Sequence, residues 1–369
     1  MRRPMKGEIV YYRLFDIGAS VDLDEMRRTI DMPFLSGKLL SERSAPRYAR
    51  FTQPILVHVD ERKIETNMGR LTVTIAVKLY GVGALAVVVR TPFEATSLRE
   101  LRPFANLRIQ AAEGEETLDD YCARFVQRIT EDLVPFLHDA YDVKVDPEPY
   151  TVYCVSVTET PVRLFREALR REVTALLAND PRPDAISDEE VEDTWRNWFS
   201  YYQDDLVVLE WDAALVIEPS ATYEDTLTVF ELANLQLLEL RVYDAFVDKV
   251  VDRAYDDLED LFDRNSLLRS GHDTVKQLAE ARMDLSEGTF QVDNISKLWG
   301  DWFLGKVYRA CVRKFELDAW RRNVEEKMKD LSDIYEVAHT ELETRRLIVL
   351  EVLVVLLFVV NLVFIAFGK

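Results

Sequence analysis

Five aspartates recur at every fourth residue within one acidic stretch of the chain. The row consists of Asp244, Asp248, Asp252, Asp256 and Asp260. On a helix, residues four apart are neighbours, and like charges at that spacing repel each other by roughly 0.2–0.5 kcal/mol per pair. Three arrangements would offset this repulsion. The carboxylates could hold a divalent cation, they could face a basic row on a partner helix, or they could form a solvated face eased by nearby lysine and arginine.

Basic residues that could face this aspartate row lie further along the chain. They are Lys306, Arg309, Arg313, Lys314 and Arg321. No EF-hand pattern accompanies the aspartates. The sequence therefore leaves all three arrangements open, with any bound metal unidentified.

Two further polar residues, Glu351 and Asn361, interrupt the apolar stretch that ends the chain, LIVLEVLVVLLFVVNLVFIAF. In a heptad register both fall on the a/d seam, so they share one helix face. Polar groups in hydrocarbon gain by facing another helix, which predicts an oligomer seam or a pore-facing surface. The alternative is that Glu351 reaches the membrane interface and Asn361 is tolerated.

The apolar stretch from Leu347 to Phe367 predicts a single transmembrane helix. Its 21 residues rise about 1.5 Å each, or ~31 Å, which matches the thickness of the hydrocarbon core. Arg345 and Arg346 precede the stretch, and only Gly368 and Lys369 follow it. The positive-inside rule then predicts that the bulk of the chain lies in the cytoplasm.

Composition excludes several classes of function. The formal charge of −20 argues against nucleic-acid binding, although a basic protein partner or a cation fits it. The three cysteines and four histidines are scattered without metal-ligand spacing, and no phosphate-binding or nucleophile motif occurs. The N-terminus has no apolar signal-peptide region. We therefore expect no catalytic residues, no enzyme activity and no cofactor, apart from a possible divalent cation.

The pattern of elements predicts an α+β fold with three parts. Residues 1–220 should form a mixed α/β domain, residues 221–346 a helical hairpin or coiled-coil stalk, and residues 347–367 the span. Within the first part, capping boxes at Asp22 and Ser187 should open helices. The predicted strands cover 9–17, 54–59, 71–80, 82–90 and 150–158, and two short strands at 206–211 and 214–218 may return to the same sheet.

Helices alone are predicted after Thr222. One should run from Thr222 to about Arg264, a shorter one from Asp273 to Leu285, and the last from about Ile295 to the end, with Gly300 and Gly305 as weak points. In the last helix, apolar residues alternate steps of four and three: Val324, Met328, Leu331, Tyr335, Ala338 and Leu342. This seam predicts packing against the long helix and additional self-association into a homo-oligomer.

Aromatic residues gather in the connecting part of the first domain. They are Trp195, Trp198, Phe199, Tyr201, Tyr202 and Trp211. Such a cluster is typical of a core that joins two layers, and less often of a docking surface. Cys154, within a predicted strand, should be a core residue.

A resemblance to a known family rests on three stretches of the sequence. They are DDLVVLEWDAAL at 204–215, FELANLQLLELRVYD at 230–244, and the apolar ending with its paired arginines and early glutamate. The chain resembles bacterial relatives of the "required for meiotic nuclear division" and sporulation-type membrane proteins. Mitochondrial members of that family are associated with the inner membrane, which implies an anchoring or scaffolding role. For a bacterial relative, the resemblance implies a single-pass protein of the bacterial inner membrane. The layout is also similar to CorA-type magnesium channels, but the Gly-Met-Asn signature and second span of those channels are absent.

These observations together predict a non-enzymatic, membrane-anchored scaffold or tether that displays a cytoplasmic α/β domain on a self-associating stalk. The alternative is a CorA-like cation channel whose single spans assemble around a pore lined by Glu351 and Asn361.

Overall fold

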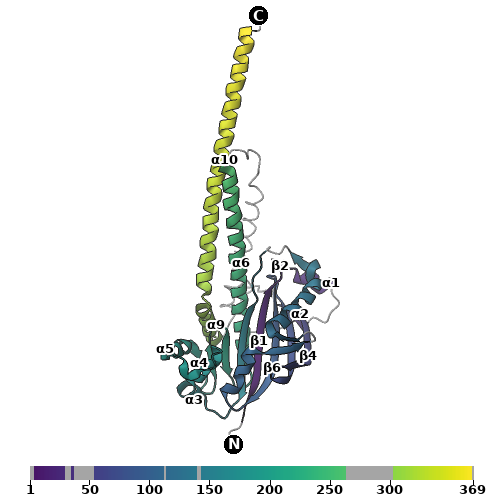
Figure 1. Ribbon diagram of the computed structural model, residues 1–369, viewed down its shortest axis with the longest axis vertical. Coiled ribbons are helices and arrows are strands. Elements are labelled where there is room, and N and C mark those ends of the chain that lie inside the picture. Colours follow the sequence, from purple (N-terminus) through teal and green to yellow (C-terminus); the bar gives the residue numbers. More distant parts are fainter. Residues whose placement is uncertain are drawn as a thin grey trace. The chain divides into compact units, whose positions relative to one another are not determined.

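The computed structural model describes residues 4–29, 35–36, 54–111, 114–138, 143–262 and 302–367 (Figure 1). The chain forms two compact units. The first comprises Met1–Val242 and Glu287–Trp320, and the second Tyr243–Ser286 and Arg321–Lys369. The divisions after Val242 and after Trp320 fall inside long helices, because the start of each helix belongs to the first unit, and the third division lies outside the described residues. The predicted boundary at residue 220 instead separated the long helix from the sheet.

The first unit is built on one large sheet with the strand order β11-β12-β13-β10-β1-β6-β5-β4-β7-β8, and β3 pairs with β4. The strands are β1 Met5–Asp16, β3 Leu35–Ser36, β4 Ile55–Thr66, β5 Gly69–Leu79, β6 Ala84–Ala95, β7 Arg108–Ala111, β8 Gly114–Thr117, β10 Glu148–Val157, β11 Trp198–Phe199, β12 Leu206–Leu209 and β13 Ala213–Ile217. A small ribbon pairs β2 Ser20–Val21 with β9 Leu137–His138.

Among the described strands, β10 and β13 form the one parallel pair, and the other neighbours are antiparallel. This confirms the α+β class with a largely antiparallel sheet. It also confirms that the two short strands near residues 206–218 return to the sheet, where β13 pairs with β10.

Strand β1 lies in the middle of the sheet and is buried on both faces. Ile9 and Tyr11 belong to the core on one face, and Val10, Tyr12 and Leu14 to the core on the other. Successive side chains of a strand point to opposite faces, so a strand covered on both sides reads as a continuous apolar run. The sequence IVYYRLF of β1 fits this position.

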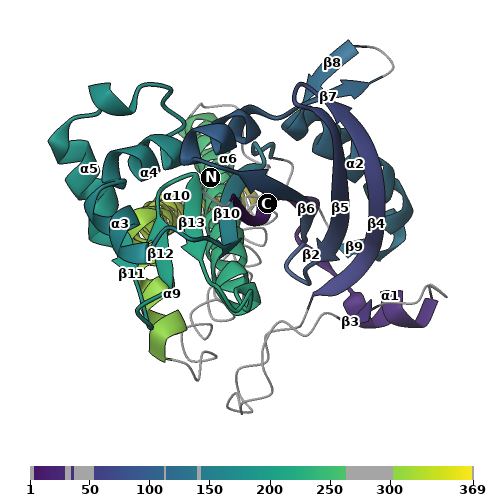
Figure 2. The same ribbon diagram turned by 90° about the horizontal axis from the view of Figure 1, so that it is seen from below.

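Helices cover both faces of the sheet (Figures 1 and 2). The first core lies under α1 Leu23–Thr29, the 3-10 segment η1 Leu98–Asn106, α2 Leu118–Leu133, α3 Val162–Glu167, α4 Arg170–Leu177 and α5 Asp188–Thr194. The second core lies under the first half of α6 Glu224–Phe262 and under α9 Trp302–Lys314. The domain is therefore a three-layer sandwich with α6 on one side.

Two predicted helix caps are confirmed. The Asp22 carboxylate accepts a hydrogen bond from the Glu25 amide at 2.8 Å, and the Ser187 hydroxyl accepts one from the Glu190 amide at 3.2 Å. Helix α2 ends at Leu133, because Pro135 cannot continue an α-helix. The helix that Ser187 caps, α5, ends at Thr194, so Trp195 and Trp198 lie beyond its end.

Of the two weak points predicted in the last helix, Gly300 lies outside the described residues and Gly305 does not break the helix. Gly305 lies buried inside α9, whereas the chain leaves helical geometry at Glu316, whose φ is +53°. The fully buried Phe315 beside it explains the break, since its side chain is fixed in the second core. The last helix, α10, then runs from Leu317 to Phe367. The helix predicted at 273–285 lies outside the described residues.

The second unit contains the later part of α6 and most of α10. Leu331 of α10 packs with Val250 and Ala254 of α6 in a small apolar cluster, and Val324 is also buried. This confirms the first part of the predicted seam as packing within one chain. The side chains of the seam residues after Leu331 lie outside the described part.

Candidate functional site

The first two aspartates of the predicted row are paired with α10. The Lys327 Nζ lies 2.7 Å from Oδ1 of Asp244 and 2.7 Å from Oδ1 of Asp248. Asn323 donates a further hydrogen bond of 2.7 Å to Asp244. Burial lowers the pKa of Lys327, but its hydrogen bonds to both carboxylates outweigh that effect and raise it. An interhelical salt bridge therefore offsets repulsion at this end of the row.

The remaining aspartates divide into an exposed one and two undescribed ones. Asp252 is exposed to solvent. The side chains of Asp256 and Asp260 lie outside the described residues. Within the described ranges, no group of three or more histidine, cysteine, aspartate or glutamate side chains could hold a metal ion. Of the three predicted arrangements, the described residues thus favour the ion pair at Asp244 and Asp248.

Lys306 and Lys314, two of the basic residues considered as partners for this row, bind elsewhere. Lys314 forms ion pairs with Glu210 and, at 3.1 Å, with Asp193, and the Lys306 Nζ lies 3.4 Å from the ring centroid of Trp302. Both lysines belong to α9 and find these partners within the first unit. The break at Glu316 ends α9 before the stalk, so the cation that reaches the aspartates is Lys327 on α10.

We predict that replacing Lys327 by methionine destabilises the helix pair. Asp244 and Asp248 would then repel each other without a cation between them. Because Lys327 is about a quarter exposed, the expected loss is modest, about 0.5–1 kcal/mol. Urea unfolding followed by circular dichroism measures it. The matched control is Lys329→Met, on an exposed neighbour, and an equal loss in both variants would contradict the pairing.

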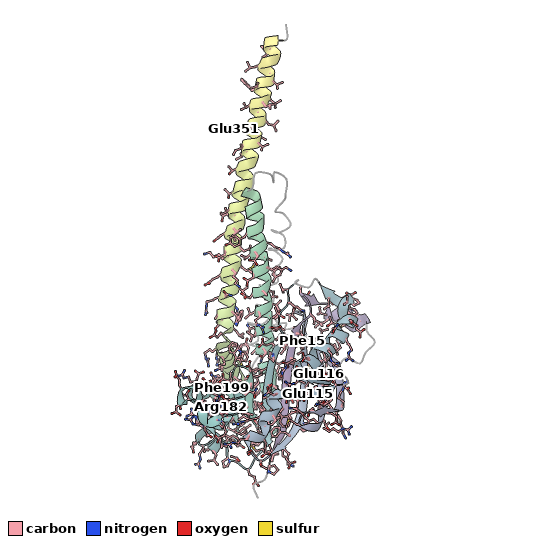
Figure 3. All side chains as sticks on the ribbon, in the orientation of Figure 1. Phe15, Glu115, Glu116, Arg182, Phe199 and Glu351 are labelled. Carbon is pink, nitrogen blue, oxygen red and sulfur yellow. The ribbon has the colours of Figure 1, made fainter. Side chains whose placement is uncertain are left out.

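The predicted seam residues Glu351 and Asn361 are both exposed on α10, where Figure 3 labels Glu351. Every described side chain from Leu347 to Leu362 is exposed, and the large apolar ones show 44–68% of their surface. Over the residues that the structure describes, there is no helix with enough length and apolar character to cross a membrane.

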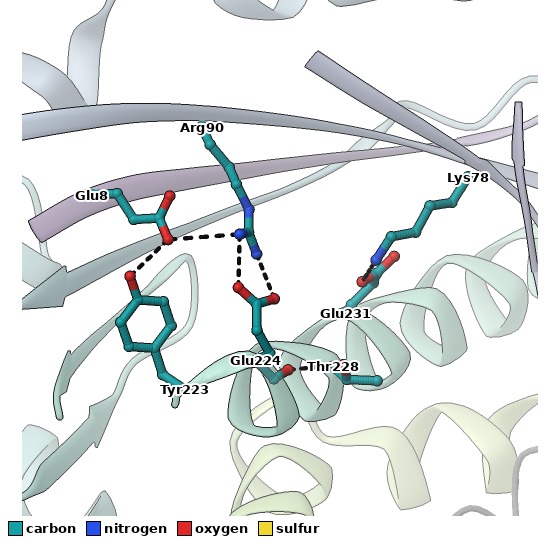
Figure 4. A network of polar contacts seen from close by, with 7 residues as sticks. All are labelled: Glu8, Lys78, Arg90, Tyr223, Glu224, Thr228 and Glu231. Atoms are coloured by element: carbon teal, nitrogen blue, oxygen red, sulfur yellow. Dashed lines mark hydrogen bonds and ion pairs between the residues drawn. The ribbon is translucent and has the colours of Figure 1, made fainter. Parts of the chain in front are cut away.

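A polar network between α6 and the sheet was not predicted (Figure 4). The Arg90 guanidinium donates two hydrogen bonds of 2.7 Å to the carboxylate of Glu224, and it lies 3.6 Å from Glu8. Tyr223 donates to the same Glu8 carboxylate at 2.7 Å. These contacts fix the start of α6 on strands β1 and β6.

A second and more deeply buried part of this network lies further along α6. The Glu231 side chain is 1% exposed, and its oxygens accept hydrogen bonds of 2.5 Å each from Lys78 Nζ and Tyr80 Oη. Burial, together with the negative charge of Glu231, raises the pKa of Tyr80 well above its usual value. Tyr80 therefore remains a hydrogen-bond donor, and the carboxylate is neutralised by Lys78.

One signal in the sequence could have revealed this network. Glu231 and Glu239 lie in an otherwise apolar run of α6, and Lys78 lies between Val77 and Leu79 of a strand. Charged residues in segments that are otherwise apolar are rarely buried unless they are paired. A charged residue of each sign in two otherwise apolar elements indicates that the two charges pair with each other in the core.

The aromatic cluster is divided between core and surface. Trp195 is 5% exposed, which confirms the core interpretation for that residue. Tyr201 and Tyr202 are 59% and 65% exposed, so the same interpretation is wrong for them. They follow β11 in a turn, where their amides bind the Asp205 carboxylate instead of continuing the sheet.

The cysteine thiols are far from nucleophilic. Cys122, Cys154 and Cys311 are fully buried, as predicted for Cys154. Burial raises the pKa of Cys122 to about 12 and raises the pKa of the other two as well. Since the thiolate is the reactive form, these side chains contribute packing within the described fold.

Comparison with known proteins places most of the sheet domain in one family. Residues 6–224 match the family model described as the N-terminal domain of the uncharacterized protein MJ0711. A relative, the uncharacterized protein MJ0711 of Methanocaldococcus jannaschii, is 24% identical over 220 residues, which cover 58% of this chain. The match spans 65% of that relative, which is less than two thirds of its length. No solved structure matches. These matches do not bear on the resemblance to meiotic-division, sporulation or CorA-type proteins.

Proposed function

The chain belongs to the family of the MJ0711 N-terminal domain, and we propose that it is a membrane-anchored tether, in which α10 holds the family domain at a membrane surface. The sheet domain would serve as the displayed part, and the ion-paired helices of the second unit as its connection to the anchor. The observation that carries this proposal is the apolar end of α10.

The apolar surface of α10 surrounds the helix instead of forming a stripe. A surface helix of a globular protein buries one apolar face and keeps a polar one. From Leu347 to Leu362, the described side chains are exposed at every helical position, and two are polar. Burying one such aliphatic side chain is worth about 1.5–3 kcal/mol. Lipid is the solvent that satisfies all sides of this helix together.

The length of the segment also supports an anchor. The described side chains from Leu347 to Leu362 number 16, which is about 24 Å of helix and less than the ~30 Å of hydrocarbon. The proposal therefore extends to the whole apolar segment of the sequence, through Phe367, at ~31 Å. Arg345 and Arg346 would mark the cytoplasmic interface and leave the domain in the cytoplasm.

Flotation with lipid vesicles tests the anchor. Full-length protein reconstituted with neutral phosphatidylcholine vesicles should float with them in a density gradient and resist extraction at high pH. A chain that ends at Arg346 should stay at the bottom of the gradient. If both chains float equally, the sheet domain or the stalk binds lipid, and the proposed anchor is wrong.

Self-association of the anchors is a second proposal, supported by the exposure of both polar residues, Glu351 and Asn361, on α10. In lipid, each would gain a hydrogen-bonding partner on a second copy. Cross-linking in membranes should give a discrete oligomer that is lost in the double variant Glu351→Leu, Asn361→Leu. Cation flux in proteoliposomes that vanishes in the same variant would support the channel alternative. If both the wild type and the double variant are monomeric in membranes, self-association is contradicted.

A further inference from the structure

Three large aromatic side chains are exposed near the β11 edge of the sheet. Tyr201 and Tyr202 lie in the turn after β11, Trp302 is the first residue of α9, and 59%, 65% and 66% of their surfaces are exposed. The ring centroids of Tyr201 and Tyr202 are 4.7 Å apart, and the Tyr201 ring lies 5.8 Å from that of Phe303, which follows Trp302. The neighbouring elements β11 and α9 thus bring these four residues into one surface, which we call the aromatic platform (Figure 2).

The rings of the platform stand nearly upright on one another. The plane of Tyr201 makes an angle of 78° with that of Tyr202 and 77° with that of Phe303. In such an edge-to-face pair, the ring that presents its edge keeps both of its faces free of the other ring. Exposed tyrosine and tryptophan rings that gather in this way are typical of surfaces that bind another molecule. Trp211 lies at the other end of β12 and is not part of the platform.

Negative charge lies directly behind the two tyrosines. Asp205 is 6% exposed, and its carboxylate oxygens accept hydrogen bonds from the amides of Tyr201 at 2.7 Å and Tyr202 at 2.9 Å. Across the described part of the chain, no lysine or arginine pairs with this carboxylate. The neighbouring Asp204 is exposed, and it also has no ion-pair partner within the described ranges. The tyrosine end of the platform therefore carries two carboxylates without a described counter-charge.

The other end of the platform already holds a cation on an aromatic ring. The Nζ atom of Lys306 lies 3.4 Å from the ring centroid of Trp302. The negative face of an aromatic ring attracts a cation at this distance. Among the residues that the structure describes, no cation lies in this way over Tyr201 or Tyr202, whose faces remain available. Since one lysine stands against two carboxylates, the platform as a whole favours a positively charged ligand.

We propose that the aromatic platform docks a basic segment of a partner protein, whose arginine or lysine side chains lie over the rings of Tyr201 and Tyr202. A guanidinium stacks on an aromatic face, and the aliphatic stems of both residue types cover apolar surface. The net charge of −20 attracts the same kind of partner over a longer range. An apolar or acidic segment would instead cover the carboxylates of Asp204 and Asp205 without a counter-charge, which is costly. The platform belongs to the first unit, so this inference does not depend on the proposed anchor.

Fluorescence anisotropy with the full chain in a mild, uncharged detergent tests the proposal. The probe is a dye-labelled peptide that consists of lysine and arginine only, and the wild type should bind it. In the double variant Tyr201→Leu, Tyr202→Leu, the Kd should rise about five- to thirtyfold, as expected for the loss of two cation–π contacts. This variant keeps the formal charge of the chain, so the general attraction between the peptide and the acidic protein is unchanged.

Three further variants separate the ring faces from other properties of the surface. The double variant Tyr201→Phe, Tyr202→Phe keeps both ring faces and should bind the peptide within about twofold of the wild type. Tyr255→Leu removes a tyrosine that is 55% exposed on α6, outside the platform, and should also bind like the wild type. Asp204→Asn removes the exposed carboxylate beside the rings, so it should weaken binding and reduce the dependence of the Kd on salt.

Three results would overturn the proposal. Equal affinity of the wild type and the leucine double variant would show that the peptide binds another acidic part of the protein. A wild type that does not bind the peptide would exclude a basic partner. A dimer of the full chain that dissociates in the leucine variant, measured by sedimentation velocity, would assign the platform to a second copy. If the double variant does not fold, Tyr202→Leu alone repeats the measurement, with an expected rise in Kd of about two- to fivefold.

Discussion

With the proposed anchor, a full-length variant with Val354, Val355 and Leu356 replaced by aspartate should leave the membrane fraction. Each acidic residue near the centre of a span costs about 2.5–3.5 kcal/mol on insertion. The combined insertion cost of three aspartates exceeds the favourable insertion free energy of the remaining apolar side chains of the helix. Cell fractionation with a tag on the sheet domain measures the change, and the soluble fraction should rise from a few per cent to the majority.

The matched control for this experiment replaces the same three residues by other apolar residues. The variant Val354→Leu, Val355→Leu, Leu356→Val should remain in the membrane fraction. Near-ultraviolet circular dichroism should show that the sheet domain is unchanged in both variants. Retention of the aspartate variant in extracted membranes would mean that another part of the chain, or a partner, holds the protein there.

The Glu231→Ala variant should destabilise the sheet domain strongly. It leaves Lys78 without its counter-charge and Tyr80 without its acceptor, between α6 and β5. Removing one partner of a buried ion pair costs about 3–5 kcal/mol, and the lower value is expected because Lys78 is about a quarter exposed. Denaturant unfolding measures the loss.

A double-mutant cycle separates the ion pair from simple cavity formation. The cycle compares the single variants Glu231→Met and Lys78→Met with the double variant that carries both. The double variant should lose less stability than the sum of these two single losses, because it removes both charges. Glu224→Gln is the control, since its carboxylate is largely exposed and should cost under about 1 kcal/mol. Additive losses in the cycle would contradict a coupled buried pair.

Local patterns in the sequence predicted much of the fold. The caps at Asp22 and Ser187 follow from short-range chemistry. The continuous apolar runs of β12 and β13 fit short strands that are buried on both faces of the sheet. The break at Glu316 was missed because it depends on where the Phe315 side chain is buried, which is a tertiary effect. Helix propensity alone pointed to Gly300, which lies outside the described residues, and to Gly305, where packing in the second core keeps the chain helical.

The site was predicted less completely than the fold. Spacing on one helix identified Asp244 and Asp248, but it could not identify Lys327, since the choice of partner depends on the register between two helices. Similarly, the partners of Glu231 are Lys78 of β5 and Tyr80 just after it, more than 150 residues earlier in the chain. Pairs at that separation are set by the strand order of the sheet, which the sequence pattern does not specify.

The depth of α10 in a bilayer tests the anchor most directly. Single cysteines at Leu347, Leu350, Val354, Phe358 and Leu362 would carry spin labels, because the three native thiols are buried. In vesicles, the account predicts that collisions with oxygen rise smoothly from Leu347 toward the centre near Phe358, while collisions with a water-soluble nickel chelate fall. Collisions with the nickel chelate that stay high at Val354 and Phe358 would contradict the anchor, and with it the proposed tether.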